Sequence, residues 1–148
     1  NRQLTADVGS SGRFMSLFFC CIDPAHHVLH WVRAGHDPAL VYDSSTDAFD
    51  ELKGQGVALG FDDSIEYDSF QRRLKPGQII VIGTDGIWET HNKTGEMFGK
   101  AALMEIIRRS HTASAREIVD SVTGALAHFR GDVAPEDDIT LVVIKVEL

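Results

Sequence analysis

The feature of this 148-residue sequence that most constrains its fold is an apolar run that ends in a tight acidic turn. The four residues from Ile79 to Ile82 are all branched and apolar, and Gly83-Thr84-Asp85-Gly86 follows directly. Such a run predicts a buried β-strand, and Asp-Gly is a common turn dipeptide. We therefore expect the Asp85 carboxylate at the tip of a strand. A plain strand-to-turn corner is the alternative on these residues alone.

A second strand pattern, from Ile139 to Val146, is preceded by its own acidic pair, Asp137-Asp138. Two strands that each carry aspartate at one end predict a carboxylate cluster at one edge of the core. Two carboxylates about 4 Å apart repel by roughly 1 kcal/mol in water. A divalent cation removes that cost, and oxygen ligands favour Mg²⁺ or Mn²⁺. A solvated charge pair is the alternative interpretation of Asp137-Asp138.

Along the rest of the chain, the spacing of apolar residues changes from the period of strands to the period of helices. Alternation and turn residues predict strands over 14–22, 28–33, 39–42, 65–70 and 78–83, with the first two forming a hairpin and 43–56 irregular. Apolar residues on both faces predict that 14–22 is a central strand and that 139–146 is buried on both faces. Helical spacing predicts a helix over 98–109 and another from the capping box at Ser114 to Gly131. Strands followed by helices and a last strand indicate an α+β domain.

Composition excludes several function classes. The net charge of −8 argues against a nucleic-acid partner. No apolar run reaches the roughly 18–20 residues that span a bilayer, so no membrane segment is expected in this chain. Cys20 and Cys21 are neighbours on a strand, point to opposite faces and are expected to be reduced, which favours a cytoplasmic location. A catalytic cysteine is a minor alternative. His36, in Ala34-Gly35-His36, is expected to be a turn residue whose ring forms a hydrogen bond with the backbone.

Several different short motifs follow one another along the chain in a characteristic order. They are Phe14-Met15-Ser16-Leu17-Phe18, Ala34-Gly35-His36-Asp37-Pro38, Leu59-Gly60, Leu74-Lys75-Pro76-Gly77-Gln78, Thr84-Asp85-Gly86-Ile87-Trp88-Glu89, Gly95-Glu96-Met97-Phe98-Gly99 and Asp137-Asp138-Ile139-Thr140-Leu141-Val142-Val143. Together they resemble the metal-dependent (type 2C, PPM) serine/threonine phosphatases, in the bacterial branch of the sporulation stage II E protein and the sigma-B regulator U.

The resemblance implies an αββα sandwich of two stacked antiparallel sheets flanked by helices, with a centre of two Mn²⁺ or Mg²⁺ ions. It implies that Asp85 and Asp137 are metal ligands, with Asp138 as a further candidate, and that a metal-bound water rather than a side chain attacks phosphorus. The family's N-terminal aspartate motifs are not found. We therefore expect residues 1–148 to be the C-terminal three quarters of a single phosphatase domain, with the N-terminal part missing, and to be inactive alone.

Two function hypotheses follow from this resemblance. The first is a protein serine/threonine phosphatase that dephosphorylates an anti-sigma-factor antagonist in a bacterial stress or sporulation pathway. The second is a non-catalytic module of the same fold that binds a partner-switching regulator. An unrelated metal hydrolase is disfavoured, because the sequence has no Gly-x-Ser-x-Gly elbow and its His26-x-x-x-His30 spacing falls in the predicted hairpin rather than on a helix. A homo-oligomer is also expected, since an apolar sheet edge tends to pair with another chain.

Overall fold

The computed structural model describes residues 1–147, apart from the side chain of Ser10. The chain divides into two compact units. The first consists of Asn1–Pro38 and Leu52–Lys75, and the second of Ala39–Glu51 and the residues from Pro76 onward. Each unit is built around one antiparallel sheet.

The first unit holds a short helix and a three-stranded sheet. Helix α1 (Arg2–Val8) is followed by a single 3-10 turn (Gly9–Ser11) and by strands β1 (Leu17–Asp23), β2 (Val28–Ala34) and β5 (Phe70–Arg73), which lie in the order β1-β2-β5. Strands β1 and β2 form the predicted hairpin, with Leu17 opposite Ala34 and Asp23 opposite Val28. The Asp23 side chain accepts hydrogen bonds from the backbone of Ala25 and His26 and so fixes the turn.

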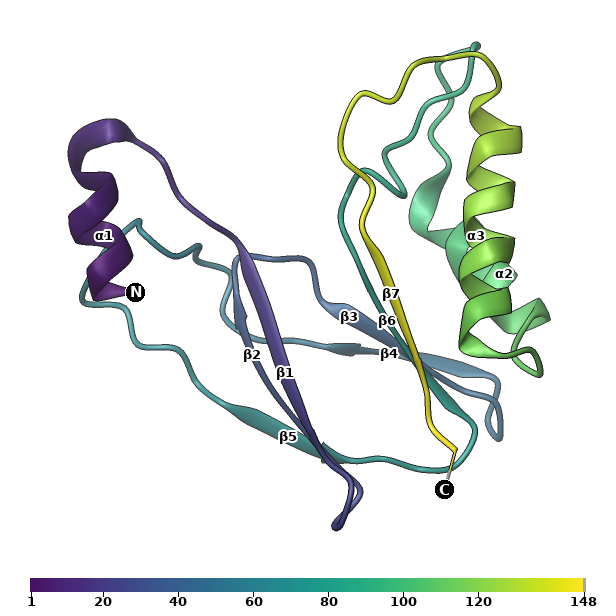
Figure 1. Ribbon diagram of the computed structural model, residues 1–148, viewed down its shortest axis with the longest axis horizontal. Coiled ribbons are helices and arrows are strands. Elements are labelled where there is room, and N and C mark those ends of the chain that lie inside the picture. The colour runs from purple at the N-terminus through teal and green to yellow at the C-terminus, as the bar shows by residue number, and fades with distance from the viewer. Residues whose placement is uncertain (148) are drawn as a thin grey trace. The chain divides into compact units, whose positions relative to one another are not determined.

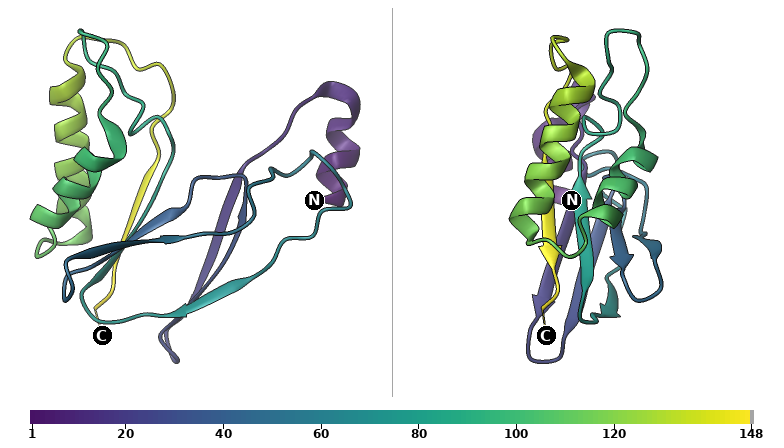
Figure 2. Two further views of the ribbon diagram at one scale, coloured as in Figure 1. Left: turned by 180° about the vertical axis from the view of Figure 1, so that it is seen from behind. Right: turned by 90° about the vertical axis from the view of Figure 1, so that its right-hand side faces the viewer.

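The second unit combines a four-stranded sheet with two helices. Its strands β3 (Ala39–Asp43), β4 (Ala48–Leu52), β6 (Gln78–Gly83) and β7 (Leu141–Lys145) lie in the order β4-β3-β6-β7. Helices α2 (Gly99–Arg109) and α3 (Ala115–Arg130) come between β6 and β7 in the chain. In both views of Figure 2, α3 runs alongside the β6–β7 pair.

The core of the second unit lies between its sheet and its helices (Figure 1). Ile79 and Val81 of β6 share a sheet face with their register partners on β3, Tyr42 and Leu40. The helices cover this face with buried residues at helical spacing, which are Leu103, Ile107, Ile118, Val122 and Leu126. These buried residues form one continuous core, and the helical spacing over 98–130 predicts the part that α2 and α3 contribute.

Helix α3 begins and ends as the sequence predicts. Ser114 accepts a hydrogen bond from the Glu117 backbone, and the Glu117 carboxylate accepts one from the Ser114 backbone, which is the capping box. Hydrogen bonds from the Ser114 backbone amide, and next from the Ser114 hydroxyl, to the Glu117 carboxylate hold the pKa of Glu117 below its usual range. At the other end Gly131 adopts a positive φ of 62° and donates to the Ala127 carbonyl. Helix α3 therefore ends at a defined residue, and the 131–140 loop begins there.

Four predictions about strands were wrong in part. Strand 14–22 is not central: β1 is an edge strand, and Phe19 is 57% exposed. The closing strand is not buried on both faces, because β7 is also an edge strand and Val142 is 44% exposed. Segment 43–56, expected to be irregular, contains β4, and the strand expected over 65–70 begins only at Phe70. Strand position depends on partners elsewhere in the chain, which local periodicity does not encode.

The fold class is confirmed as α+β with two antiparallel sheets and helices. Cys20 and Cys21 are both free thiols, and burial raises the pKa of Cys20. Among residues 1–147, none of the helices is both long enough and apolar enough to cross a bilayer.

Candidate metal-binding edge

A hydrogen-bonded junction joins the Thr84 turn to the acidic loop before β7. Strands β6 and β7 pair with Gly83 opposite Leu141, so the turn and the loop leave the sheet at the same end. The Thr84 hydroxyl donates to the Asp138 carbonyl over 3.1 Å and accepts from the Thr140 backbone over 3.0 Å. The Thr84 amide also donates to the Thr140 carbonyl. The two predicted acidic segments are therefore tied together at one edge of the sheet.

Gly86 lets these two segments approach closely. A Cβ placed on Gly86 would lie 2.5 Å from the Asp138 carbonyl oxygen, a distance that real Cβ atoms essentially never show. The turn is closed by further backbone bonds, from the Glu89 amide to the Asp85 carbonyl and from the Ile87 amide to the Thr84 carbonyl. Glycine in the Thr-Asp-Gly motif is thus required for packing against the second acidic segment.

The three predicted ligands occupy this edge as exposed carboxylates. Asp85 accepts a hydrogen bond from the Gly86 amide at 3.1 Å through Oδ1, and Asp137 accepts one from the Asp138 amide at 2.7 Å. Each of these bonds is accepted by the Oδ1 oxygen of its carboxylate. The donor type fits a hard cation such as Mg²⁺ or Mn²⁺. The number of donors is small, because no group of three or more His, Cys, Asp or Glu side chains within residues 1–147 could hold a metal ion.

The segment after Gly86 forms a rigid turn that returns to α2. Thr90 donates from its hydroxyl to the Gly86 carbonyl at 2.6 Å, and His91 bridges to Met97 across the turn. Inside it, the Asn92 side chain accepts from the Thr94 and Glu96 backbones and donates to the Glu96 carboxylate. Those side-chain bonds lower the pKa of Glu96. The turn holds His91 in a fixed place beside the acidic edge.

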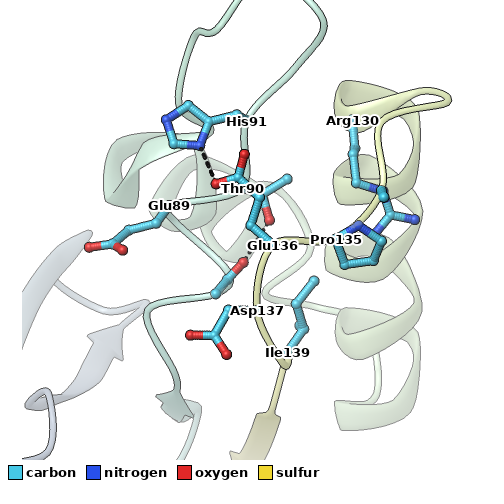
Figure 3. Close-up of a pocket in the computed structure, with 10 residues that line it drawn as sticks. Glu89, Thr90, His91, Arg130, Pro135, Glu136, Asp137 and Ile139 are labelled. Atoms are coloured by element: carbon cyan, nitrogen blue, oxygen red, sulfur yellow. Dashed lines mark hydrogen bonds and ion pairs between the residues drawn. The ribbon is translucent and has the colours of Figure 1, made fainter.

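A pocket of about 70 Å³ lies between this turn, the end of α3 and the loop that carries Asp137. His91 contributes an imidazole whose Nδ1 lies 3.4 Å from the Glu136 carboxylate, and Arg130 contributes a guanidinium from the last turn of α3. Figure 3 shows the His91 ring directed at Glu136, with Asp137 on the same loop. His91, Arg130 and Glu136 lie outside the sequence motifs. A basic residue in the last helical turn is ordinary, and only tertiary structure brings these three together.

His36 and two aromatic residues, Trp88 and Phe98, have structural roles. The His36 ring donates from Nδ1 to the Asp37 carbonyl at 2.8 Å between β2 and β3, as expected for a turn histidine. Trp88 and Phe98 pack against the core of the second unit, and Phe98 meets Phe129 edge-on at 5.4 Å. These residues support the turn that carries Asp85 and take no part in the acidic edge itself.

Solved structures that match this chain include phosphatase domains. The SiaA-PP2C domain of Pseudomonas aeruginosa matches with a TM-score of 0.73 and 24% identity, over 84% of this chain and 49% of that domain. The Mn-presoaked phosphatase domain of SpoIIE from Bacillus subtilis matches with a TM-score of 0.67 and 18% identity, over 89% of this chain and 56% of that one. The chain therefore has the PP2C-type phosphatase fold.

Sequence comparison gives the family within this fold class. The model of the stage II sporulation protein E family matches residues 1–147, and the chain belongs to that family. It is 28% identical over 145 residues to the phosphoserine phosphatase RsbU of Bacillus subtilis, a match that covers 98% of this chain. The match covers only 42% of RsbU, so the chain spans less than half the length of that relative. The resemblance drawn from the motifs is confirmed.

Proposed function

We propose that this chain is part of a metal-dependent protein serine/threonine phosphatase. The observation that carries the proposal is the Thr84 junction, because it brings Asp85 and Asp137 to one edge although 51 residues separate them in the sequence. An unpaired acidic edge is unfavourable, and the protein maintains it with a backbone bond to each aspartate. The similarity to the phosphoserine phosphatase RsbU supports this activity.

In this proposal Asp85 and Asp137 each give a carboxylate oxygen to a Mn²⁺ or Mg²⁺ ion, and Asp138 is a further candidate ligand. Two such ions in a complete site would neutralise phosphoryl charge and activate water. The chain's own part is to fix the ligands: Thr84 clamps the 138–140 backbone, and Gly86 permits the close approach. The Mn-presoaked form of the SpoIIE domain supports the choice of metal.

We infer that the substrate is a phosphorylated anti-sigma-factor antagonist, a small protein of the partner-switching type. Support comes from membership of the stage II sporulation protein E family and from the similarity to RsbU. A protein substrate is also consistent with the open character of the edge, where Asp85, Asp137 and Asp138 are all exposed. We place this reaction in the cytoplasm.

The test uses the protein that carries this chain, with Asp85→Asn and Asp137→Asn compared with Asp120→Asn. Asp120 is an exposed aspartate on α3, away from the acidic edge, and serves as the matched control. The first two variants should lose about tenfold or more in Mn²⁺ affinity by calorimetry, because each removes a charged ligand, and should lose release of phosphate from a phosphoserine protein. Wild-type Mn²⁺-dependent hydrolysis by both variants would refute the proposal.

A second candidate function is a binding module without catalysis. It is favoured by the lack of any three-ligand metal group among residues 1–147. In that case Asp120→Asn, Asp85→Asn and Asp137→Asn would all bind the antagonist equally well, with or without EDTA, and no variant would release phosphate. For residues 1–148 alone we expect weak Mn²⁺ binding, because these ions normally take about six oxygen ligands.

A further inference from the structure

The pocket beside the acidic edge contains two nitrogen atoms whose hydrogen-bonding capacity is unused. Over the part of the chain that the structure describes, the buried side-chain polar atoms without a hydrogen-bond partner are His91 Nδ1 and Arg130 Nε. Both residues line the same pocket, although one comes from the 86–98 turn and the other from the end of α3. Buried polar groups are almost always satisfied, so an unsatisfied pair in one pocket calls for an occupant.

The chemistry of the two nitrogens selects the kind of occupant. Arginine is always charged and offers only donors, and a histidine ring nitrogen donates when it carries the ring proton. The fixed charge of Arg130 attracts an oxygen acceptor with negative charge, while the carboxylates of Glu89, Glu136 and Asp137 also line the pocket. The volume of about 70 Å³ exceeds the roughly 10–15 Å³ that a single water requires. It suits a small group such as phosphate or a carboxylate and excludes a nucleotide.

Glu136 marks where such a group would bind. Its carboxylate lies 3.4 Å from His91 Nδ1, close enough for ionic attraction but without a hydrogen bond, and its side chain is 69% exposed. An exposed ion pair of this kind contributes little stability. Glu136 can therefore swing into solvent at small cost and leave the imidazole to an external anion. Figure 3 shows this carboxylate between His91 and the rest of the pocket.

We propose that this pocket is an oxyanion-binding site, with Arg130 and His91 as donors and Glu136 as a displaceable internal competitor. Its role rests on the proposed function. Asp137 forms part of the pocket wall, so the bound group would be either phosphate released at the acidic edge or an acidic side chain of the phosphoprotein substrate. Phosphate and carboxylate share the chemistry that the two donors recognise, and their sources are separated by experiment.

The experiment titrates the metal-free protein, in EDTA, with inorganic phosphate and separately with acetate. Binding is followed by NMR through the Arg130 Nε–H signal and the backbone amides of residues 89–91. Arg130→Gln should weaken binding by about tenfold or more, since it removes a charge-assisted donor. Glu136→Gln should strengthen it several-fold, since it removes the competing charge. Arg116→Gln, on the exposed first turn of α3, is the control and should change nothing.

Arg130→Gln is expected to weaken anion binding and Glu136→Gln to strengthen it. Simple misfolding would weaken binding in both variants, so the two results together distinguish the proposal from misfolding. Stronger binding of phosphate than of acetate assigns the pocket to the released product, and the reverse assigns it to a substrate carboxylate. No saturable shift with either anion, weaker binding by Glu136→Gln, or an equal loss in Arg116→Gln would overturn the proposal. Because the titration in EDTA contains no metal, anion binding can be observed even if the proposed phosphatase activity is absent. Phosphatase activity can likewise be present even if the pocket binds no anion.

Discussion

Replacing Gly86 by alanine tests whether close packing between the Gly86 turn and the 137–140 segment holds the acidic edge together. The new Cβ would lie 2.5 Å from the Asp138 carbonyl oxygen and 3.2 Å from its carbon. Ordinary contact begins at 3.4 Å, so the carbonyl has to retreat by about 0.9 Å, the difference between 3.4 and 2.5 Å. Where the carbonyl moves away from the Thr84 hydroxyl, a retreat of that size stretches their 3.1 Å hydrogen bond beyond useful range.

The magnitude follows from two costs. Forcing extra volume into a packed contact costs about 1–3 kcal/mol, and a lost hydrogen bond costs about 0.5–1.5 kcal/mol. We therefore expect Gly86→Ala to lower the free energy of unfolding by about 2–4 kcal/mol. Gly124→Ala is the matched control, because Gly124 is an exposed position within α3 and its new Cβ would meet no atom within 4 Å. Better helix propensity should stabilise that variant by about 0.5–1 kcal/mol.

The assay is urea denaturation of both variants beside the wild type, with NMR shifts of the amides from Asp138 to Thr140 as a local probe. Gly86→Ala should move these amides, and Gly124→Ala should not. The reasoning is refuted if Gly86→Ala unfolds within about 0.5 kcal/mol of the wild type. It is also refuted if a large destabilisation leaves the three amides unshifted, because the loss would then arise away from the junction.

Two further predictions concern charge and association. Hydrogen bonds from Arg108, and next from Tyr42, hold the pKa of Asp47 below its usual range, so this contact stabilises the fold above pH about 4 and is lost as the pH falls further. Urea midpoints of Asp47→Asn should therefore fall less on acidification than those of the wild type, and an equal fall would contradict the assignment. Phe19 is 57% exposed on the edge strand β1, so the chain should self-associate in sedimentation velocity and Phe19→Lys should reduce association. A wild type that stays monomeric at high concentration would show that this edge needs no partner.

The sequence by itself determined the elements whose signals are local. The capping box at Ser114 and the glycine at 131 set both ends of α3, because caps act through bonds within one turn. The branched run before Gly83 set β6, which is buried almost throughout, since four apolar residues in succession have no polar face to expose. The Thr-Asp-Gly and Asp-Asp-Ile-Thr motifs likewise marked the two acidic segments from the residues alone.

Tertiary structure decided what depends on partners distant in the chain. The apolar runs of β1 and β7 resemble central strands, but both lie at sheet edges, because a strand's place is set by which other strands pair with it. The acidic edge needs the Thr84 hydroxyl to meet backbone groups more than 50 residues away. The pocket of His91, Arg130 and Glu136 gathers side chains from a turn, a helix end and a loop. No local pattern encodes that meeting, because it exists only once α3 and the 131–140 loop have closed onto the sheet.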